Sequence, residues 1–154
     1  DDMNVLTPRE LKSRYEIKME KMVMKLQIEG RVLGDLIKNH VIPAAYSYQN
    51  KLIENVQGLK SIFGREGDKI GRSQKELIKK ISTHVEKLDV LVEKMIDGRR
   101  KANKIDDIKK RAEAYIKNVK VYFDDISYHS NKLEIMIDDE IWPLPKLREM
   151  LFTR

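Results

Sequence analysis

The sequence predicts an all-α protein, an antiparallel helical bundle with a long kinked first helix and an extended C-terminal tail. Three observations support this fold class. Apolar residues recur at alternating spacings of three and four over long stretches, as in helices that pack side by side. Two helix-start signatures, "TPRE" at residues 7–10 and "SQKE" at residues 73–76, precede such stretches. No segment shows the alternation of apolar and polar residues that is typical of a half-buried strand.

The first helix is expected over residues 8–63. Thr7 fits the N-cap, Pro8 the first helical position and Glu10 the reciprocal partner of a capping box. The glycines of "GREGDKIG" should end this element. Its apolar seam comprises Tyr15, Met19, Met22, Leu26, Leu33, Leu36, Leu52, Val56, Leu59 and Phe63.

Two further helices are expected over residues 73–97 and 104–137, followed by an extended tail over 138–154 and all within one domain, 1–154. Ser73 and Glu76 repeat the capping signature, and Gly98 is expected to end the second helix. The seam of the third helix is nearly unbroken, which favours one continuous element. The two seams comprise Leu77, Ile81, Leu88, Leu91 and Met95, and then Ile108, Ala112, Tyr115, Val119, Tyr122, Ile126, Leu133 and Met136.

The stretch "IEGRVLGDLIKNHVIPAAYSYQN" at residues 28–50 combines several charged residues with a proline. Continuing the seam places Glu29 and His40 on the inward face, about three turns apart, or roughly 16 Å, which is too far to share one metal ion. Pro43 removes one backbone hydrogen bond and disfavours helix at the preceding residue, so a kink is expected there. Reversal of the chain at Pro43 is the alternative.

Three histidines, His40, His84 and His129, each fall on or beside the seam. In antiparallel helices, residues at equal distances in sequence from the connecting turn lie opposite each other. With turns near Gly67 and Ala102, His84 then lies opposite residues near 52 and 120. His40 and His129 would therefore lie at different positions along the bundle axis from His84. This register favours three separate histidines with their own hydrogen-bond partners over one zinc site.

Composition and motifs argue against an enzyme contained in this stretch alone. The 154 residues include no cysteine, no glycine-rich phosphate loop, no metal-binding histidine pair at helical spacing and no nucleophile elbow. No apolar run is long enough to span a membrane, and no secretory signal is evident, so a cytoplasmic protein is expected. The beginning at "DDMNVLTPRE" resembles a cut end, so the chain is interpreted as a fragment of a larger enzyme.

The net charge of +6 raises the question of an anionic partner. The only dense basic stretch is Arg99, Arg100 and Lys101, with Lys104 just beyond, and no aromatic residue is interleaved to stack on bases. A solvated helix end is the favoured interpretation, because cations complement the dipole at a helix C-terminus. A free-standing helical module that binds an acidic partner or nucleic acid through Arg99–Lys104 is the alternative function.

The tail "IWPLPKLREMLF" carries an unusual set of large apolar residues. Pro143 and Pro145 prevent helix continuation, so Trp142 should lie in extended chain. Trp142, Leu144, Leu151 and Phe152 either anchor the tail on its own bundle or dock a neighbouring domain or subunit.

Long strings of this sequence resemble the C-terminal region of type III glutamine synthetases. They are "SRYEIKMEKMVMKLQIEGRVLGDLIKNHVIPAAYSYQNKLIENVQGLKSIFG", "RRKANK" and "DDEIWPLPKLREMLF", and the likeness extends from about Ser13 to Phe152. The resemblance implies an ATP-dependent glutamate–ammonia ligase of nitrogen assimilation, which forms γ-glutamyl phosphate and assembles as stacked rings of identical subunits. It also implies that ATP, Mg or Mn and glutamate are held by a separate β-rich catalytic domain of the same polypeptide.

None of the family's catalytic motifs falls in these residues, so no catalytic, cofactor-binding or metal-binding role is assigned to any position. The chain is expected to be an accessory C-terminal helical domain, inactive alone, that acts in subunit packing and assembly. A straight helix of about 55 residues would reach about 80 Å and overhang shorter partners. Its overhanging seam is therefore expected to be exposed and to pack on the catalytic domain, another subunit or a second copy. The candidate interface is Tyr15, Met19, Met22, Leu26, Glu29, Leu33, Leu36, Trp142, Leu144, Leu151 and Phe152, with Glu29 needing a cationic partner across it.

Overall fold

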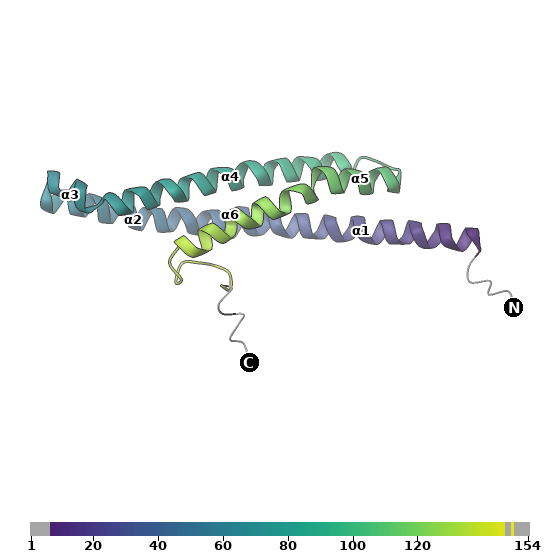
Figure 1. Ribbon diagram of the computed structural model, residues 1–154, viewed down its shortest axis with the longest axis horizontal. Coiled ribbons are helices and arrows are strands. Elements are labelled where there is room, and N and C mark those ends of the chain that lie inside the picture. Colours follow the sequence, from purple (N-terminus) through teal and green to yellow (C-terminus); the bar gives the residue numbers. More distant parts are fainter. Residues whose placement is uncertain (1–6, 147–148, 150–154) are drawn as a thin grey trace. The chain divides into compact units, whose positions relative to one another are not determined.

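The computed structural model describes residues 7–146 and residue 149. The described residues form helices without strands, which confirms the all-α class. A first helical stretch of 56 residues consists of α1 (Pro8–Leu36), a π-helical turn η1 (Ile37–Val41) and α2 (Ile42–Phe63). It is followed by α3 (Arg65–Ile70), α4 (Arg72–Ala102), α5 (Ile108–Asn118), a 3-10 turn η2 (Lys120–Tyr122) and α6 (Phe123–Met136), as Figure 1 shows.

The described residues divide into two compact units. The first unit contains residues 7–34 and 93–123, and therefore most of α1, the end of α4, α5 and η2. The second unit contains residues 35–92, 124–146 and 149, and therefore η1, α2, α3, the first two-thirds of α4, and α6. Each unit has its own buried apolar residues.

The start of α1 is the capping box that the sequence predicts. The Thr7 hydroxyl accepts a hydrogen bond from the Glu10 N–H at 3.3 Å, and the Glu10 carboxylate accepts from the Thr7 N–H at 2.8 Å. These bonds satisfy amide groups that have no partner within the helix. The Thr7 hydrogen bonds favour the charged carboxylate and lower the pKa of Glu10.

The backbone remains helical past Pro43, so the chain does not reverse there. The Ile42 N–H bonds to the Ile37 carbonyl, five residues back, and Ile42 keeps helical dihedral angles of −62° and −46°. A proline supplies no N–H, which leaves a carbonyl of the preceding turn without its usual partner. The wider π turn directly before Pro43 re-routes the backbone hydrogen bonds at this point, as is typical of helix irregularities.

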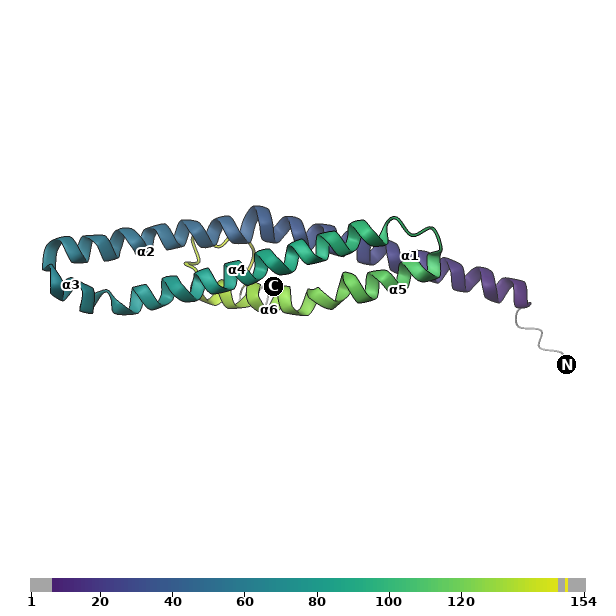
Figure 2. The same ribbon diagram turned by 90° about the horizontal axis from the view of Figure 1, so that it is seen from above.

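Gly64 ends α2, as the glycine-rich stretch predicts. Its φ of 56° and ψ of −126° lie in a region that side chains disfavour. The following α3 is a short helix within the expected loop, and Figures 1 and 2 show α2 and the first half of α4 lying side by side and antiparallel beyond it. The expected cap at Ser73 is wrong, because α4 begins at Arg72 and the Ser73 hydroxyl donates to Gln74.

Gly98 does not end the second long helix, which continues to Ala102. A β-carbon at position 98 would lie 2.0 Å from the carbonyl oxygen of Asn118 at the end of α5. The glycine is therefore explained by the close approach of two helices and not by helix termination.

The third expected helix, over 104–137, is divided in the structure. Asp107 caps α5 by accepting from the Lys110 N–H at 2.8 Å, so the helix begins four residues later than the expected start at 104. At Val119 the backbone leaves the helical region, with φ of −125°, and η2 precedes α6. Val119 is completely buried and packs against Gly30, so the interruption lies at a close contact with α1.

The core of each unit follows the apolar seams. In the first unit the buried hydrophobic residues are Val23, Leu26, Met95, Ala102, Ala112, Tyr115 and Val119. In the second unit they include Ile37, Val41, Ala45, Ile81, Val85, Leu88, Val92, Ile126, Leu133, Ile137 and Trp142. Gln49 is also buried, and its amide donates to the Ile78 carbonyl at 2.9 Å and the Ser82 hydroxyl at 2.7 Å.

Candidate functional site

The apolar seam of α1 is less exposed than its expected overhang predicts. Leu26 is only 6% exposed, while Met19, Met22, Leu33 and Leu36 are half-buried. Within the first unit α5 extends back along α1 as far as Tyr15, whose ring lies 5.9 Å from the Lys109 ammonium group. The exposed part of the seam is therefore confined to the first turns of α1. The turn between α4 and α5 lies later in the chain than the sequence predicts, so these two helices cover more of α1.

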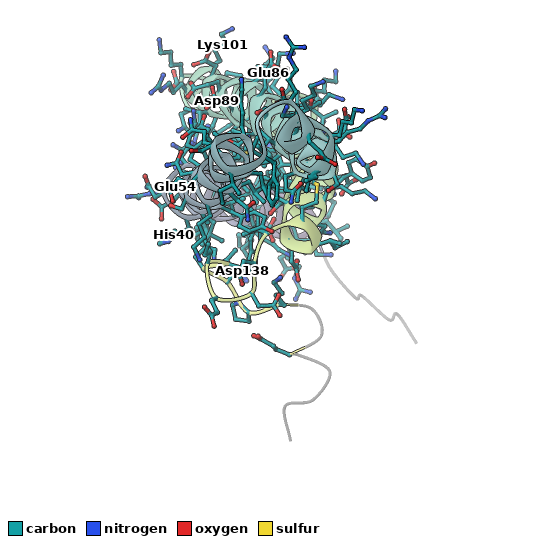
Figure 3. The ribbon with its side chains drawn as sticks, turned by 90° about the vertical axis from the view of Figure 1, so that its left-hand side faces the viewer. His40, Glu54, Glu86, Asp89, Lys101 and Asp138 are labelled. Atoms are coloured by element: carbon teal, nitrogen blue, oxygen red, sulfur yellow. The ribbon has the colours of Figure 1, made fainter. Side chains whose placement is uncertain are left out.

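Glu29 and His40 do not face inward, so the seam does not continue through them. Glu29 is exposed and pairs with Lys25 of the same helix at 3.7 Å. His40 is exposed as well, and Figure 3 shows its side chain at the surface. Elsewhere on the surface of this stretch, the Asn39 amide donates to the Asp35 carboxylate at 2.5 Å. Glu29 needs no cation from another chain.

A second apolar face of α1 is exposed on the side opposite its buried residues. It comprises Ile17, Met24, Ile28 and Val32, which are 50%, 61%, 56% and 51% exposed. Spacings of seven, four and four residues place them on one side of a helix. We call these four residues the outer face of α1. The same spacing is visible in the sequence, but the stronger seam on the other side obscured it.

The tail folds back on the second unit as far as it is described. Trp142 is buried. The backbone N–H groups of Ile141 and Trp142 both donate to the Asp138 carbonyl at 3.0 Å. Lys146 is nearly buried, donates to the Ile137 carbonyl at 3.1 Å and pairs with Asp139. Trp142 thus anchors the tail on its own helices, and Leu144 is half-buried. Leu151 and Phe152 lie outside the described residues.

The indole N–H of Trp142 is buried and has no hydrogen-bond partner among the described residues. A buried donor of this kind costs free energy when it remains unpaired.

His84 on α4 and His129 on α6 meet within the second unit. Their Nδ1 atoms are 2.8 Å apart, and their ring centroids are separated by 5.1 Å. The expected register, which set these two histidines at different heights, is wrong. The turn after α4 occupies residues 103–107, later than assumed, and this shift moves the residues opposite His84 toward His129. His40 remains apart from the pair.

Both histidines have lowered pKa values, mainly because burial disfavours the charged imidazolium. The pKa of His84 is lowered further by His129, Lys87 and Lys132, and that of His129 by Lys87. Asp125 acts in the opposite direction on His129. Two neutral imidazoles can share a hydrogen bond in which one Nδ1 donates and the other accepts.

An open pocket of about 490 Å³ adjoins this pair. Its lining includes His129 and Asp125 of α6, together with Thr83, Glu86 and Lys87 of α4. Among residues 7–146 and 149, no group of three or more histidine, aspartate, glutamate or cysteine side chains is arranged to hold a metal ion.

The basic stretch at residues 99–104 lies at the end of α4. Arg99, Arg100 and Lys101 occupy its last turn, where cations offset the negative end of the helix dipole. Arg100 pairs with Asp97 at 3.4 Å. The position of these cations at the C-terminal end of α4 therefore explains why basic residues cluster there.

The two units define a class of protein: helical domains of long antiparallel helices with one exposed apolar helix face. Residues 1–60 match the family model described as the glutamine synthetase C-terminal domain. A glutamine synthetase of Bacteroides fragilis is 48% identical over 151 residues, and a type-3 glutamine synthetase of Dictyostelium discoideum is 27% identical over 156 residues. A glutamine synthetase of Butyrivibrio fibrisolvens is 22% identical over 149 residues. The chain is therefore similar to the C-terminal region of glutamine synthetases, and its expected likeness to the type III enzymes is confirmed.

These matches cover 97% to 99% of the chain. In each case the chain spans only about a fifth, 21%, of the length of the curated relative. No helix within the described part of the chain is long and apolar enough to cross a membrane.

Proposed function

We propose that this chain is an accessory domain of an ATP-dependent glutamine synthetase and acts in subunit packing and assembly. The parent enzyme is a glutamate–ammonia ligase of nitrogen assimilation, and the chain contributes no catalytic residue to it. The family match and the relatives support the parent activity. ATP and Mg or Mn belong, in this proposal, to a catalytic domain of the same polypeptide, which assembles as a homo-oligomer.

The observation that carries the packing role is the outer face of α1. Four large apolar side chains lie along one side of the helix and are each at least half exposed. Exposed apolar side chains grouped on one side of a helix are typical of an interaction site, because their contact with water is unfavourable. Lys21 and Lys25 are exposed on the same side of the helix, so their ammonium groups lie among these apolar side chains.

The outer face also revises the candidate interface. Leu26 already packs inside the first unit, so a charge there would disrupt folding before it disrupted assembly. Tyr15 is exposed at the start of α1 and can extend the interface, whereas Trp142 is buried within the second unit.

The test introduces Met24→Asp together with Ile28→Asp into the full-length enzyme. We expect the oligomer to dissociate or weaken in sedimentation velocity, and glutamine synthesis to fall with it. A matched control is Ile62→Asp, since Ile62 is 75% exposed and belongs to α2 in the second unit, not to the outer face. An intact and fully active assembly in the double variant would contradict the proposal, and so would equal dissociation by the control.

A further inference from the structure

We propose that the outer face of α1 docks on an acidic protein surface of the parent enzyme, where apolar side chains are bordered by carboxylates, and not on a second copy of itself. This inference rests on the proposed packing role and deepens it, because it states the charge of the partner and the symmetry of the contact. It concerns the first unit alone.

The positive charge of the chain is concentrated in the first unit. Its described residues, 7–34 and 93–123, include 17 lysines and arginines against 9 aspartates and glutamates, a net charge of +8. In the second unit, over residues 35–92, 124–146 and 149, the corresponding numbers are 12 and 14, a net charge of −2. A charge excess of this size attracts surfaces of the opposite sign. A partner of the first unit is therefore expected to be acidic.

Cations alternate with the apolar side chains along the outer face. Lys21 lies four residues after Ile17 and three before Met24, and Arg31 lies three residues after Ile28. Residues three or four apart lie on the same side of a helix, so both cations belong to this surface. Both are exposed, and neither forms a salt bridge with a residue that the structure describes. Their charges are available to a partner.

Two carboxylates border the same face and do not cancel its positive charge. Glu29 already pairs with Lys25 at 3.7 Å, so these two groups offset each other. Glu20 lies one helical turn before Met24 and offsets only one of the other two cations. The outer face thus combines four apolar side chains with a net positive charge.

A second copy of this chain does not supply the complementary charge. In a two-fold contact both sides present the same surface, and residues near the symmetry axis face their own equivalents. Lys21 and Lys25 lie at the middle of the outer face, so a contact centred there would gather both lysines of each copy around the axis. Repulsion between like charges and the desolvation of lysines beside apolar groups oppose this arrangement. The contact is therefore heterologous, with a different surface on the other side.

The apolar side chains favour a protein partner over an anionic lipid surface. On a membrane, apolar side chains enter the acyl region while cations remain beside them at the headgroups. Lys21 lies within the apolar row, between Ile17 and Met24, and not at its border. A protein surface can place a carboxylate opposite this lysine and apolar side chains on either side of it.

The test is charge reversal in the full-length enzyme, by Lys21→Glu with Arg31→Glu. Like charges across the interface should weaken assembly by about tenfold or more, as measured by sedimentation velocity over a series of protein concentrations. Lys21→Gln with Arg31→Gln should have a smaller effect, because it removes the attraction without adding repulsion. Added salt should weaken assembly of the unaltered enzyme and strengthen that of the charge-reversed variant, because it screens both interactions.

The matched control is Arg65→Glu with Lys80→Glu. Both residues are exposed and belong to the second unit, and the change in net charge is the same. This variant should leave assembly unchanged. Equal dissociation by the control would assign the effect to net charge and overturn the proposal.

Comparison with the variant Met24→Asp and Ile28→Asp separates this inference from the packing role. If the apolar variant dissociates and charge reversal has no effect, the packing role stands and the acidic partner is wrong. If the apolar variant leaves the assembly intact, the packing role itself is wrong.

Met24→Cys tests the symmetry of the contact under mild oxidation. A two-fold contact would bring two copies of this position together and link two subunits by a disulfide. A heterologous contact should give no link beyond that of the unaltered enzyme, so a disulfide specific to the variant would overturn the proposal. Vesicles containing phosphatidylserine test the lipid alternative. Vesicle binding that charge reversal abolishes, with assembly unaffected, would assign the outer face to a membrane surface instead.

Discussion

Gly98 of α4 and Asn118 of α5 approach so closely that a β-carbon at position 98 would lie 2.0 Å from the Asn118 carbonyl oxygen. A backbone atom cannot swing aside as a flexible side chain can, so the two helices would have to separate. This contact lies beside the interruption at Val119 and holds α4 and α5 together in the first unit.

We therefore expect Gly98→Ala to destabilise the chain by about 1–3 kcal/mol, as overpacking in a well-packed region does. Gly58 on α2 is the matched control, because a β-carbon there would have no neighbour within 4 Å. Gly58→Ala should stabilise by about 0.5–1 kcal/mol, since alanine favours helix. Urea unfolding followed by circular dichroism measures both; a neutral Gly98→Ala would show that the helices are farther apart.

The buried hydroxyl of Tyr115 donates to the Asn103 side chain at 2.6 Å and connects α5 to the loop before it. Burial raises the pKa of Tyr115 above the ordinary value of a phenol, because the charged form is disfavoured away from water. Tyr115→Phe should cost about 0.5–1.5 kcal/mol, the usual contribution of one hydrogen bond. The double variant with Asn103→Ala should cost little more than either change alone, and fully additive losses would rule out this bond.

Stability should fall in mild acid because of the histidine pair. Both pKa values lie below 6.5 in the folded chain, so the unfolded chain takes up protons first as the pH falls. The contribution of the pair is complete above about pH 6.5 and is lost as the pH falls from there through the folded pKa values. Urea midpoints at pH 7.5 and 5.5 measure this loss.

The double variant His84→Gln and His129→Gln is the control for that pH dependence. It should remove most of the difference between the two midpoints. Lys87, Lys132 and Asp125 stay in place and their effects are common to both proteins. An unchanged pH dependence would assign the effect to other groups.

The chain alone should be strongly helical and without ligase activity, if its role is the proposed one. Circular dichroism reports the helix content, and phosphate release with glutamate, ammonia, ATP and magnesium reports turnover. Metal-dependent formation of glutamine by the purified chain would contradict the absence of catalytic residues.

Several elements could be predicted from the sequence because their causes are local. The capping box at Thr7 and Glu10, and the end of α2 at Gly64, depend on residues within one or two turns. The all-α class follows equally from the spacing of apolar residues along each helix.

Only the tertiary structure decided the features that depend on contact between helices distant in the chain. A spacing pattern shows which side of a helix is apolar. It contains no information on how far a neighbouring helix is shifted along the common axis. For that reason the pattern predicts a helix end at Gly98, an inward position for Glu29 and His40, and different heights for His84 and His129, and the structure differs at each of these points. The position of one turn, at residues 103–107, sets that register, and with it the contact between His84 and His129.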